Sequence, residues 1–371
     1  MKKSIGRVSA LVAAPVLLLA AAVAALTAGT ASASGSPPPP AGFEADSASF
    51  VSASAGYVLG ARDCSLLPCQ ALLETTANGG ATWAKVAAPN VQLVPPFSTT
   101  PATAVSSVQF ANKNDGWLFN PGLWQTTDGG KQWRKVSLPG DAVALAVAGG
   151  EAYVSIGQSD GGFTTAKLYK SVVGSGSWTL VRGVAPRNDL TAFGHSAWVG
   201  VAPDLWTTAN SGRTWTKLTF SCPKGVLSPS EVAASSPSDI AIACSDQGYP
   251  QPGMSIKEVF TSGNGGKTFQ RQGSPSEAGQ VFQLAMVPGN PKVLTLEAAS
   301  GATFLDRSAN GGKTWAQATF DDGGTGMRDL AYVSGTVGYT VHVSETPALA
   351  YGLGLLKTTN AGETWKTVKI P

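Results

Sequence analysis

The stretch SANGGKTW, residues 308–315, carries the strongest structural signal in this 371-residue chain. Asn310 has a short polar side chain that can accept hydrogen bonds from nearby backbone N–H groups and close a turn. Gly312 supplies a positive φ, which other residues reach only at a cost, and the Ser308 hydroxyl can add a bond across the turn. Trp315 then enters the next strand, where it can bury a large surface. The stretch therefore predicts a reinforced hairpin.

The octapeptide recurs along the chain. The other good copies are TANGGATW (76–83), TTDGGKQW (126–133), TANSGRTW (208–215), SGNGGKTF (262–269) and TTNAGETW (358–365), and SVVGSGSW (171–178) is a worn copy. The turn-forming and aromatic residues of the six good copies are Asn78 and Trp83, Asp128 and Trp133, Asn210 and Trp215, Asn264 and Phe269, Asn310 and Trp315, and Asn360 and Trp365. The aromatic ends are 37 to 54 residues apart, a period typical of one four-stranded unit.

Short apolar segments between the octapeptides complete the pattern. Each repeat holds four expected strands, A to D, and the octapeptide forms the C–D turn, as with LLETT before and AKV after the first copy. With 44 glycines and 13% charged residues, the chain is expected to be all-β. We predict a seven-bladed β-propeller of four-stranded antiparallel blades over residues 43–371, closed without exchange of a strand. A six-bladed ring is disfavoured, because residues 141–182 around the worn copy retain their other strands.

The N-terminus has the pattern of an export signal. Lys2, Lys3 and Arg7 precede an apolar run from Leu11 to Leu26, and a small-residue cleavage site follows. We expect residues 1–33 to be a cleaved signal peptide and 34–42 a Pro-rich linker; an uncleaved anchor is the alternative. Without the three basic residues of the leader, the 26 Lys and Arg become 23, equal to the 23 Asp and Glu. Because these charges balance, the mature chain is expected to bind neither nucleic acid nor, beyond its signal, a membrane. The export signal predicts that it is secreted, and we expect it to be a monomer.

Four cysteines in an exported chain are expected to form two disulfides. Spacing favours Cys64 with Cys69 and Cys222 with Cys244 over the two other connectivities. Neither pair has the two-residue spacing of zinc ligands. We therefore expect no metal and no cofactor.

The octapeptide pattern, Ser/Thr-x-Asp/Asn-x-Gly-x-x-Trp/Phe, resembles the Asp box of the Asp-box (BNR) repeat proteins along almost all of the mature chain. The likeness is greater to the photosystem II stability/assembly factor family, which are exported seven-bladed propellers. That resemblance implies an assembly or binding scaffold outside the cytoplasm. Sialidases also carry Asp boxes, but they need three arginines for the substrate carboxylate and an Arg-Ile-Pro motif, and this motif is absent here.

The expected binding residues lie on the face opposite the octapeptides, where the irregular B–C and D–A connections emerge. The candidates are Arg62, Arg187, Asp246, Tyr249 and Arg328. The three arginines could form an anion site, although ion pairs within the repeats are favoured over it. Both expected disulfides fall in loops of this face, where they would rigidify a binding surface or staple exposed loops. The function expected is a non-catalytic scaffold for a protein or glycan. The alternative is a sialidase-like glycoside hydrolase or lyase that uses acidic residues of the same face.

Overall fold

The computed structural model describes residues 42–62, 69–94, 103–157, 166–184, 190–201, 204–218, 220–223, 228–246, 254–321, 326–343 and 354–371. These residues form β-strands and turns, and no helix occurs among them. Within these ranges, nothing of the length and apolar character of a membrane-spanning helix is found. The expected signal peptide and nearly all of the expected linker lie outside the described residues.

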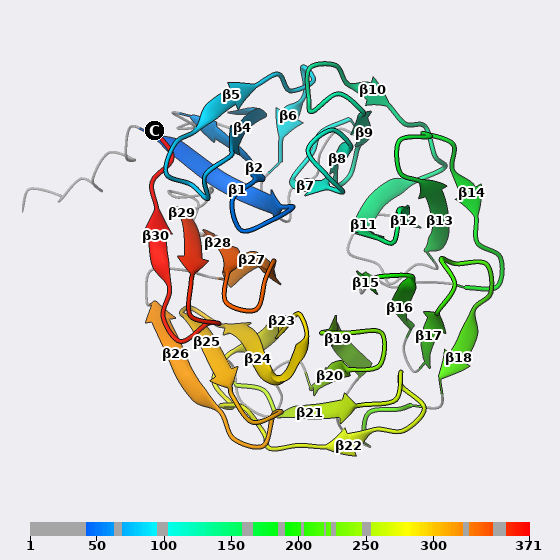
Figure 1. Cartoon of the computed structure of the whole chain (residues 1–371), viewed down its shortest axis with the longest axis vertical. Helices are drawn as coiled ribbons and strands as arrows, with labels where there is room; N and C mark the ends of the chain where they lie inside the picture. Colours follow the sequence, from blue (N-terminus) through cyan, green and yellow to red (C-terminus); the bar gives the residue numbers. More distant parts are fainter. Residues whose placement is uncertain are drawn as a thin grey trace, which may run out of the picture. The chain divides into compact units, whose positions relative to one another are not determined.

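Seven four-stranded antiparallel sheets are arranged in a ring, as predicted (Figure 1). Blade 1 comprises β1 (Phe43–Phe50), β2 (Gly56–Arg62), β4 (Leu72–Thr76) and β5 (Ala84–Val86). Blade 2 comprises β7 (Ser107–Phe110), β8 (Gly116–Phe119), β9 (Leu123–Thr126) and β10 (Arg134–Lys135). Blade 3 comprises β11 (Asp141–Ala148), β12 (Glu151–Gly157), β13 (Lys167–Val172) and β14 (Thr179–Leu180). Blades 4 and 5 comprise β15 (Leu190–Phe193), β16 (Ser196–Val201), β17 (Asp204–Thr208) and β18 (Thr216–Leu218); and β19 (Ser228–Ala234), β20 (Ile240–Ser245), β21 (Lys257–Ser262) and β22 (Gln270–Arg271). Blades 6 and 7 comprise β23 (Gln280–Val287), β24 (Asn290–Ala299), β25 (Thr303–Ser308) and β26 (Ala316–Asp321); and β27 (Gly326–Tyr332), β28 (Gly338–Val343), β29 (Gly354–Thr358) and β30 (Lys366–Val368). A separate two-stranded ribbon pairs β3 (Cys69–Gln70) with β6 (Gln92–Leu93).

The ring closes between complete blades. Blade 7 ends on its own fourth strand, and blade 1 begins on its own first strand, so no strand is exchanged, as the sequence predicts. One buried apolar cluster joins the two blades and includes Phe43 and Val58 from blade 1 with Tyr339 from blade 7. The rings of Phe50 and Tyr339 stack with centroids 3.4 Å apart, and the Tyr339 hydroxyl donates to the Ala53 carbonyl at 3.0 Å. Closure therefore rests on side-chain packing and hydrogen bonds across the junction.

The first strand of each blade lies toward the centre of the ring and the fourth at its outside (Figure 1). Polar side chains link neighbouring inner strands. The Ser47 hydroxyl of β1 accepts from the Val108 N–H of β7 at 2.9 Å, and Thr191 of β15 donates to the Val232 carbonyl of β19 at 2.8 Å. Side chains thus satisfy backbone groups on the inner strands that pair with no further strand.

The octapeptide turns have the hydrogen bonds expected of them. In the first copy the Thr76 hydroxyl accepts from the Gly80 N–H at 2.9 Å, and Asn78 Oδ1 accepts from the Thr82 N–H at 2.8 Å. Gly80 has a φ of 92°, in the left-handed region. The same pair of bonds recurs in the other five good copies. Each of these turns lies between the third and fourth strands of its blade, where it was predicted.

The turns also lock each blade to the preceding one, which the sequence does not reveal. A Cβ atom on Gly80 would lie 2.6 Å from Val368 of blade 7, and one on Gly130 would lie 2.6 Å from Val86 of blade 1. Trp133 stands just before β10 and is half-buried, and its Nε1 donates to the Ala87 carbonyl of blade 1 at 2.8 Å. The octapeptide is therefore an inter-blade contact as well as a reinforced hairpin.

The octapeptides lie on the same side of the ring as the A–B turns. In five of the six good copies the residue after the Asn or Asp donates its N–H to an A–B turn of the same blade, as Gly79 does to Ser54 at 2.7 Å and Ser211 to His195 at 2.8 Å. In blade 6 the acceptor is the Lys292 carbonyl, near the start of β24. We call this side the turn face. The B–C and D–A connections emerge at the opposite ends of the strands, which we call the loop face.

Candidate binding surface

Two connections of blade 1 are joined on the loop face. The B–C connection contributes β3 and the D–A connection contributes β6, and Cys69 pairs with Leu93. Leu93 and the nearby Val91 are buried in the cluster that joins blades 1 and 2. This part of the long 87–104 connection is thus packed against the propeller rather than free. Shortening it would remove core contacts as well as loop-face surface.

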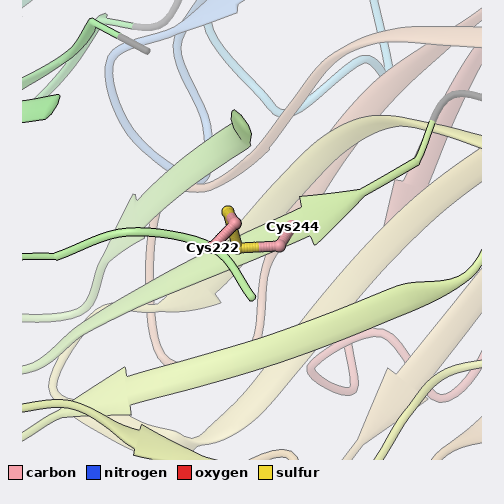
Figure 2. Close-up of a disulfide and its surroundings, with 2 residues drawn as sticks. All are labelled: Cys222 and Cys244. Carbon is pink, nitrogen blue, oxygen red and sulfur yellow. A yellow bond between two sulfur atoms is a disulfide. The ribbon is translucent and has the colours of Figure 1, made fainter. Parts of the chain in front are cut away.

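The predicted Cys222–Cys244 disulfide is present (Figure 2). Cys244 is fully buried in β20 of blade 5, whereas Cys222 follows the last strand of blade 4, and their Cα atoms are 5.9 Å apart. The bond therefore ties the connection between two blades to the second strand of the next. Cys69 is also disulfide-bonded, while Cys64 lies outside the described residues, so their pairing stays a prediction.

Replacing both Cys222 and Cys244 by alanine is expected to lower the free energy of unfolding by about 3 kcal/mol, because a bond across 22 residues restricts the unfolded chain. Denaturant titration of the double variant measures this loss. A double Cys64→Ala, Cys69→Ala variant is the matched control, and it should lose less because the loop it frees is shorter. An unchanged midpoint in the first variant would contradict the expectation.

Asp246 holds the B–C connection of blade 5 through a hydrogen bond, and its expected role in binding stays a prediction. Its Oδ1 accepts from the Ile256 N–H at 3.0 Å, and the carboxylate is buried. The neighbouring Lys257 is also buried, and its Nζ donates to the Ser276 and Ala278 carbonyls at 2.8 Å each. Burial lowers the pKa of Lys257 to about 8, although the charges of Asp306, Asp246 and Glu277 oppose this shift. These polar groups hold the junction of blades 5 and 6 together.

The structure places Arg62 and Arg328 in ion pairs, the alternative that the sequence favours. Arg62 Nη2 lies 2.8 Å from Glu74 Oε1, and its guanidinium covers the Phe43 ring at 5.5 Å. Arg328 Nη1 lies 2.9 Å from Asp46 Oδ1, across the junction of blades 7 and 1. Arg187 and Tyr249 lie outside the described residues, and an anion site built on them stays untested.

The Arg328 ion pair belongs to a buried polar cluster that closes the ring. Burial raises the pKa of Asp46 to about 6; the Arg328 charge lowers it and the Asp329 charge raises it. The other oxygen of Asp46 has no hydrogen-bond partner among the described residues. Asp329 has a left-handed φ of 55°, and its carboxylate accepts from the Ser47 hydroxyl at 2.6 Å and from the Ala48 N–H at 2.8 Å. Sequence patterning missed this cluster because its members are about 280 residues apart.

The two histidines lie in different blades. His195 lies in the A–B turn of blade 4, where its Nδ1 is 2.9 Å from the Ser211 hydroxyl. His342 is buried in β28 of blade 7. Within the described ranges, no group of three or more His, Cys, Asp or Glu side chains is arranged to hold a metal ion.

Comparison with known proteins places the fold. No family model matches the chain, and no curated protein matches it either. Several solved structures match the chain. A structure of YCF48 bound to D1 peptide has a TM-score of 0.56 and 18% identity, covering 86% of this chain and 94% of that one. This likeness supports the predicted resemblance at the level of the propeller fold.

Two enzymes have similar scores over part of their length. An ancestral GH74 enzyme has a TM-score of 0.56 at 12% identity, and a prolyl endopeptidase has 0.55 at 12%. Each match covers 89% of this chain, but only 47% of the GH74 enzyme and 50% of the prolyl endopeptidase. It therefore spans about half the length of these enzymes and nearly the whole of the YCF48 chain.

Proposed function

We propose that this protein is an exported Asp-box propeller of the photosystem II assembly factor type, which binds a polypeptide partner on its loop face without catalysis. The observation that carries the proposal is the construction of that face. Its connections are fixed by the Cys222–Cys244 disulfide and by the β3–β6 ribbon. A fixed surface loses little entropy when it binds a partner.

Three of the described acidic residues make contacts within the fold, which is consistent with binding without catalysis. Glu74 is paired with Arg62, and the Asp246 carboxylate holds its own loop. The Asp306 carboxylate accepts from the Ser276 N–H at 3.2 Å. A glycosidase needs one carboxylic acid and one carboxylate free to face a substrate, whereas these three serve the scaffold.

One of the comparisons is consistent with a polypeptide partner. The YCF48 structure contains a bound D1 peptide and matches this chain at nearly full length. The disulfide is typical of an oxidising compartment, which agrees with the proposed export. No photosynthetic partner is implied by these features, because they belong to the fold.

Site-specific photo-crosslinking tests the proposal. A photo-reactive residue replaces Gln70, which is exposed on the loop face, and in a matched variant it replaces Thr314, which is exposed on the turn face. In the native extracellular fraction, the Gln70 variant is expected to capture a discrete protein and the Thr314 variant none. Equal capture by both variants, or capture by Thr314 alone, would refute a loop-face partner.

The catalytic alternative has its own test. Purified protein is incubated with a panel of fluorogenic glycosides, and no turnover is expected. Turnover that a single Asp or Glu substitution on the loop face abolishes would establish the hydrolase instead of the scaffold.

A further inference from the structure

At the junctions that follow blades 3, 6 and 7, the residue before the octapeptide is a lysine or arginine that reaches the next turn. These bonds join Lys170 Nζ to the Ser211 carbonyl at 2.9 Å, Arg307 Nε to the Ala361 carbonyl at 2.7 Å, and Lys357 Nζ to the Gly79 carbonyl at 2.8 Å. In blades 1, 4 and 5 the same position is a threonine. In blade 2 this position is Gln125, which makes no such bond among the described residues. It faces the worn turn, 171–178.

A cavity of about 470 Å³ lies at this junction, on the turn face. Blade 2 lines it with an amide, a carboxylate, an indole and a guanidinium, and the worn turn adds two hydroxyls. The residues that supply these groups are Gln125, Asp128, Trp133, Arg134, Ser175 and Ser177. The volume is within the range of small-molecule sites, about 300–1,000 Å³.

Hydrogen bonds connect Arg134, an exposed residue of the cavity lining, to Gln125 and to the worn turn. Arg134 Nη2 donates to Gln125 Oε1 and to the Gly176 carbonyl, at 3.2 Å each. Any side chain on Gly176 would collide with this guanidinium. Because Arg134 can only donate, the Gln125 amide is oriented with its oxygen toward the arginine. Its Nε2 is a buried donor without a partner in the described part of the chain.

Trp133 and Asp128 also make hydrogen bonds within the propeller. The Trp133 indole Nε1 donates to the Ala87 carbonyl at 2.8 Å and to the Gly130 carbonyl at 3.2 Å. Asp128 is half-buried, and its pKa is lowered, chiefly by the hydrogen bond from the Gln132 N–H, so it is a carboxylate at neutral pH. Its negative charge balances the positive charge of Arg134. The cavity therefore favours no net charge in a ligand.

We propose that this cavity binds a neutral saccharide unit. Several hydroxyl groups on one small ring match the mixture of donors and acceptors, and the half-buried Trp133, which also lines the cavity, adds apolar surface beside them. The site is on the turn face, so it is separate from the polypeptide surface proposed above and does not depend on it.

Calorimetric titration with neutral pentasaccharides of glucose, xylose, mannose and N-acetylglucosamine tests the site. We expect at least one to bind, and Arg134→Gln to weaken that binding about tenfold or more. Ser177→Trp fills the cavity from the exposed worn turn and should abolish binding without changing the melting temperature. Lys135→Gln, on the same strand but outside the cavity, is the matched control and should bind as the unchanged protein does.

Three results would overturn the proposal. The first is that no neutral pentasaccharide binds with a Kd below about 10 mM. The second is that Ser177→Trp, folded as judged by its melting temperature, binds as tightly as the unchanged protein. The third is that only a sulfated oligosaccharide binds, which would mean that the site prefers an anionic ligand.

Discussion

Replacing Gly80 by alanine is expected to lower the free energy of unfolding by about 2 to 5 kcal/mol. Two costs combine at this position. The φ of 92° strains any residue with a Cβ, and that Cβ would lie 2.6 Å from Val368 on the neighbouring blade. Denaturant titration measures the loss.

Gly150→Ala separates the two costs. Gly150 has a similar φ of 80°, but nothing lies within 4 Å of its Cβ position. This control should therefore lose only the backbone strain, about 1 to 2 kcal/mol. Equal losses in the two variants would mean that the octapeptide glycine has no role between blades.

Replacing Arg328 by methionine is expected to cost about 3 to 5 kcal/mol at pH 8, because it leaves the Asp46 carboxylate buried and unpaired. The loss should shrink toward pH 5. The pKa of Asp46 is raised from 3.8 to about 6, so its contribution to stability is greatest below about pH 4 and falls as the pH rises through 6. The Arg328 charge lowers the pKa of Asp46. Without this charge the pKa is higher, so the fall in stability extends to higher pH.

Arg271→Met is the matched control for this pH dependence. Arg271 also forms an ion pair at 2.8 Å, with Glu258, but its side chain is 60% exposed and Glu258 is only half-buried, so the expected loss is about 1 kcal/mol or less. Urea titrations of both variants at pH 5 and pH 8 make the comparison. A loss for Arg328→Met that is small at both pH values would mean that this ion pair does not stabilise the closed ring.

Local features of the fold were predictable from the sequence. The spacing of Asn310, Gly312 and Trp315 and of its six relatives sets the number of blades and the position of each C–D turn. The Cys222–Cys244 disulfide was also predictable, because both cysteines occur at the ends of predicted loop-face segments. In each case the chemistry depends on residues close together in sequence or on a repeated period.

The missed features are contacts between residues distant in sequence. Gly80 meets Val368 and Arg328 meets Asp46 only because the ring closes. The proposed saccharide cavity depends on a difference between repeats: Gln125 stands where the other repeats have a lysine, an arginine or a threonine, beside a turn that has lost its Asn. Analysis of the features common to all repeats does not detect a residue that differs in one of them.

The central claim is that the octapeptide turns lock seven blades into a closed ring. Circular dichroism during thermal unfolding of a chain that ends at residue 321, and so lacks blade 7, tests it most directly. A closed ring predicts that the cooperative transition is lost, because blades 1 and 6 each lose a packed neighbour. A cooperative transition that keeps most of its stability, as stacked repeats in an open array would show, would contradict it.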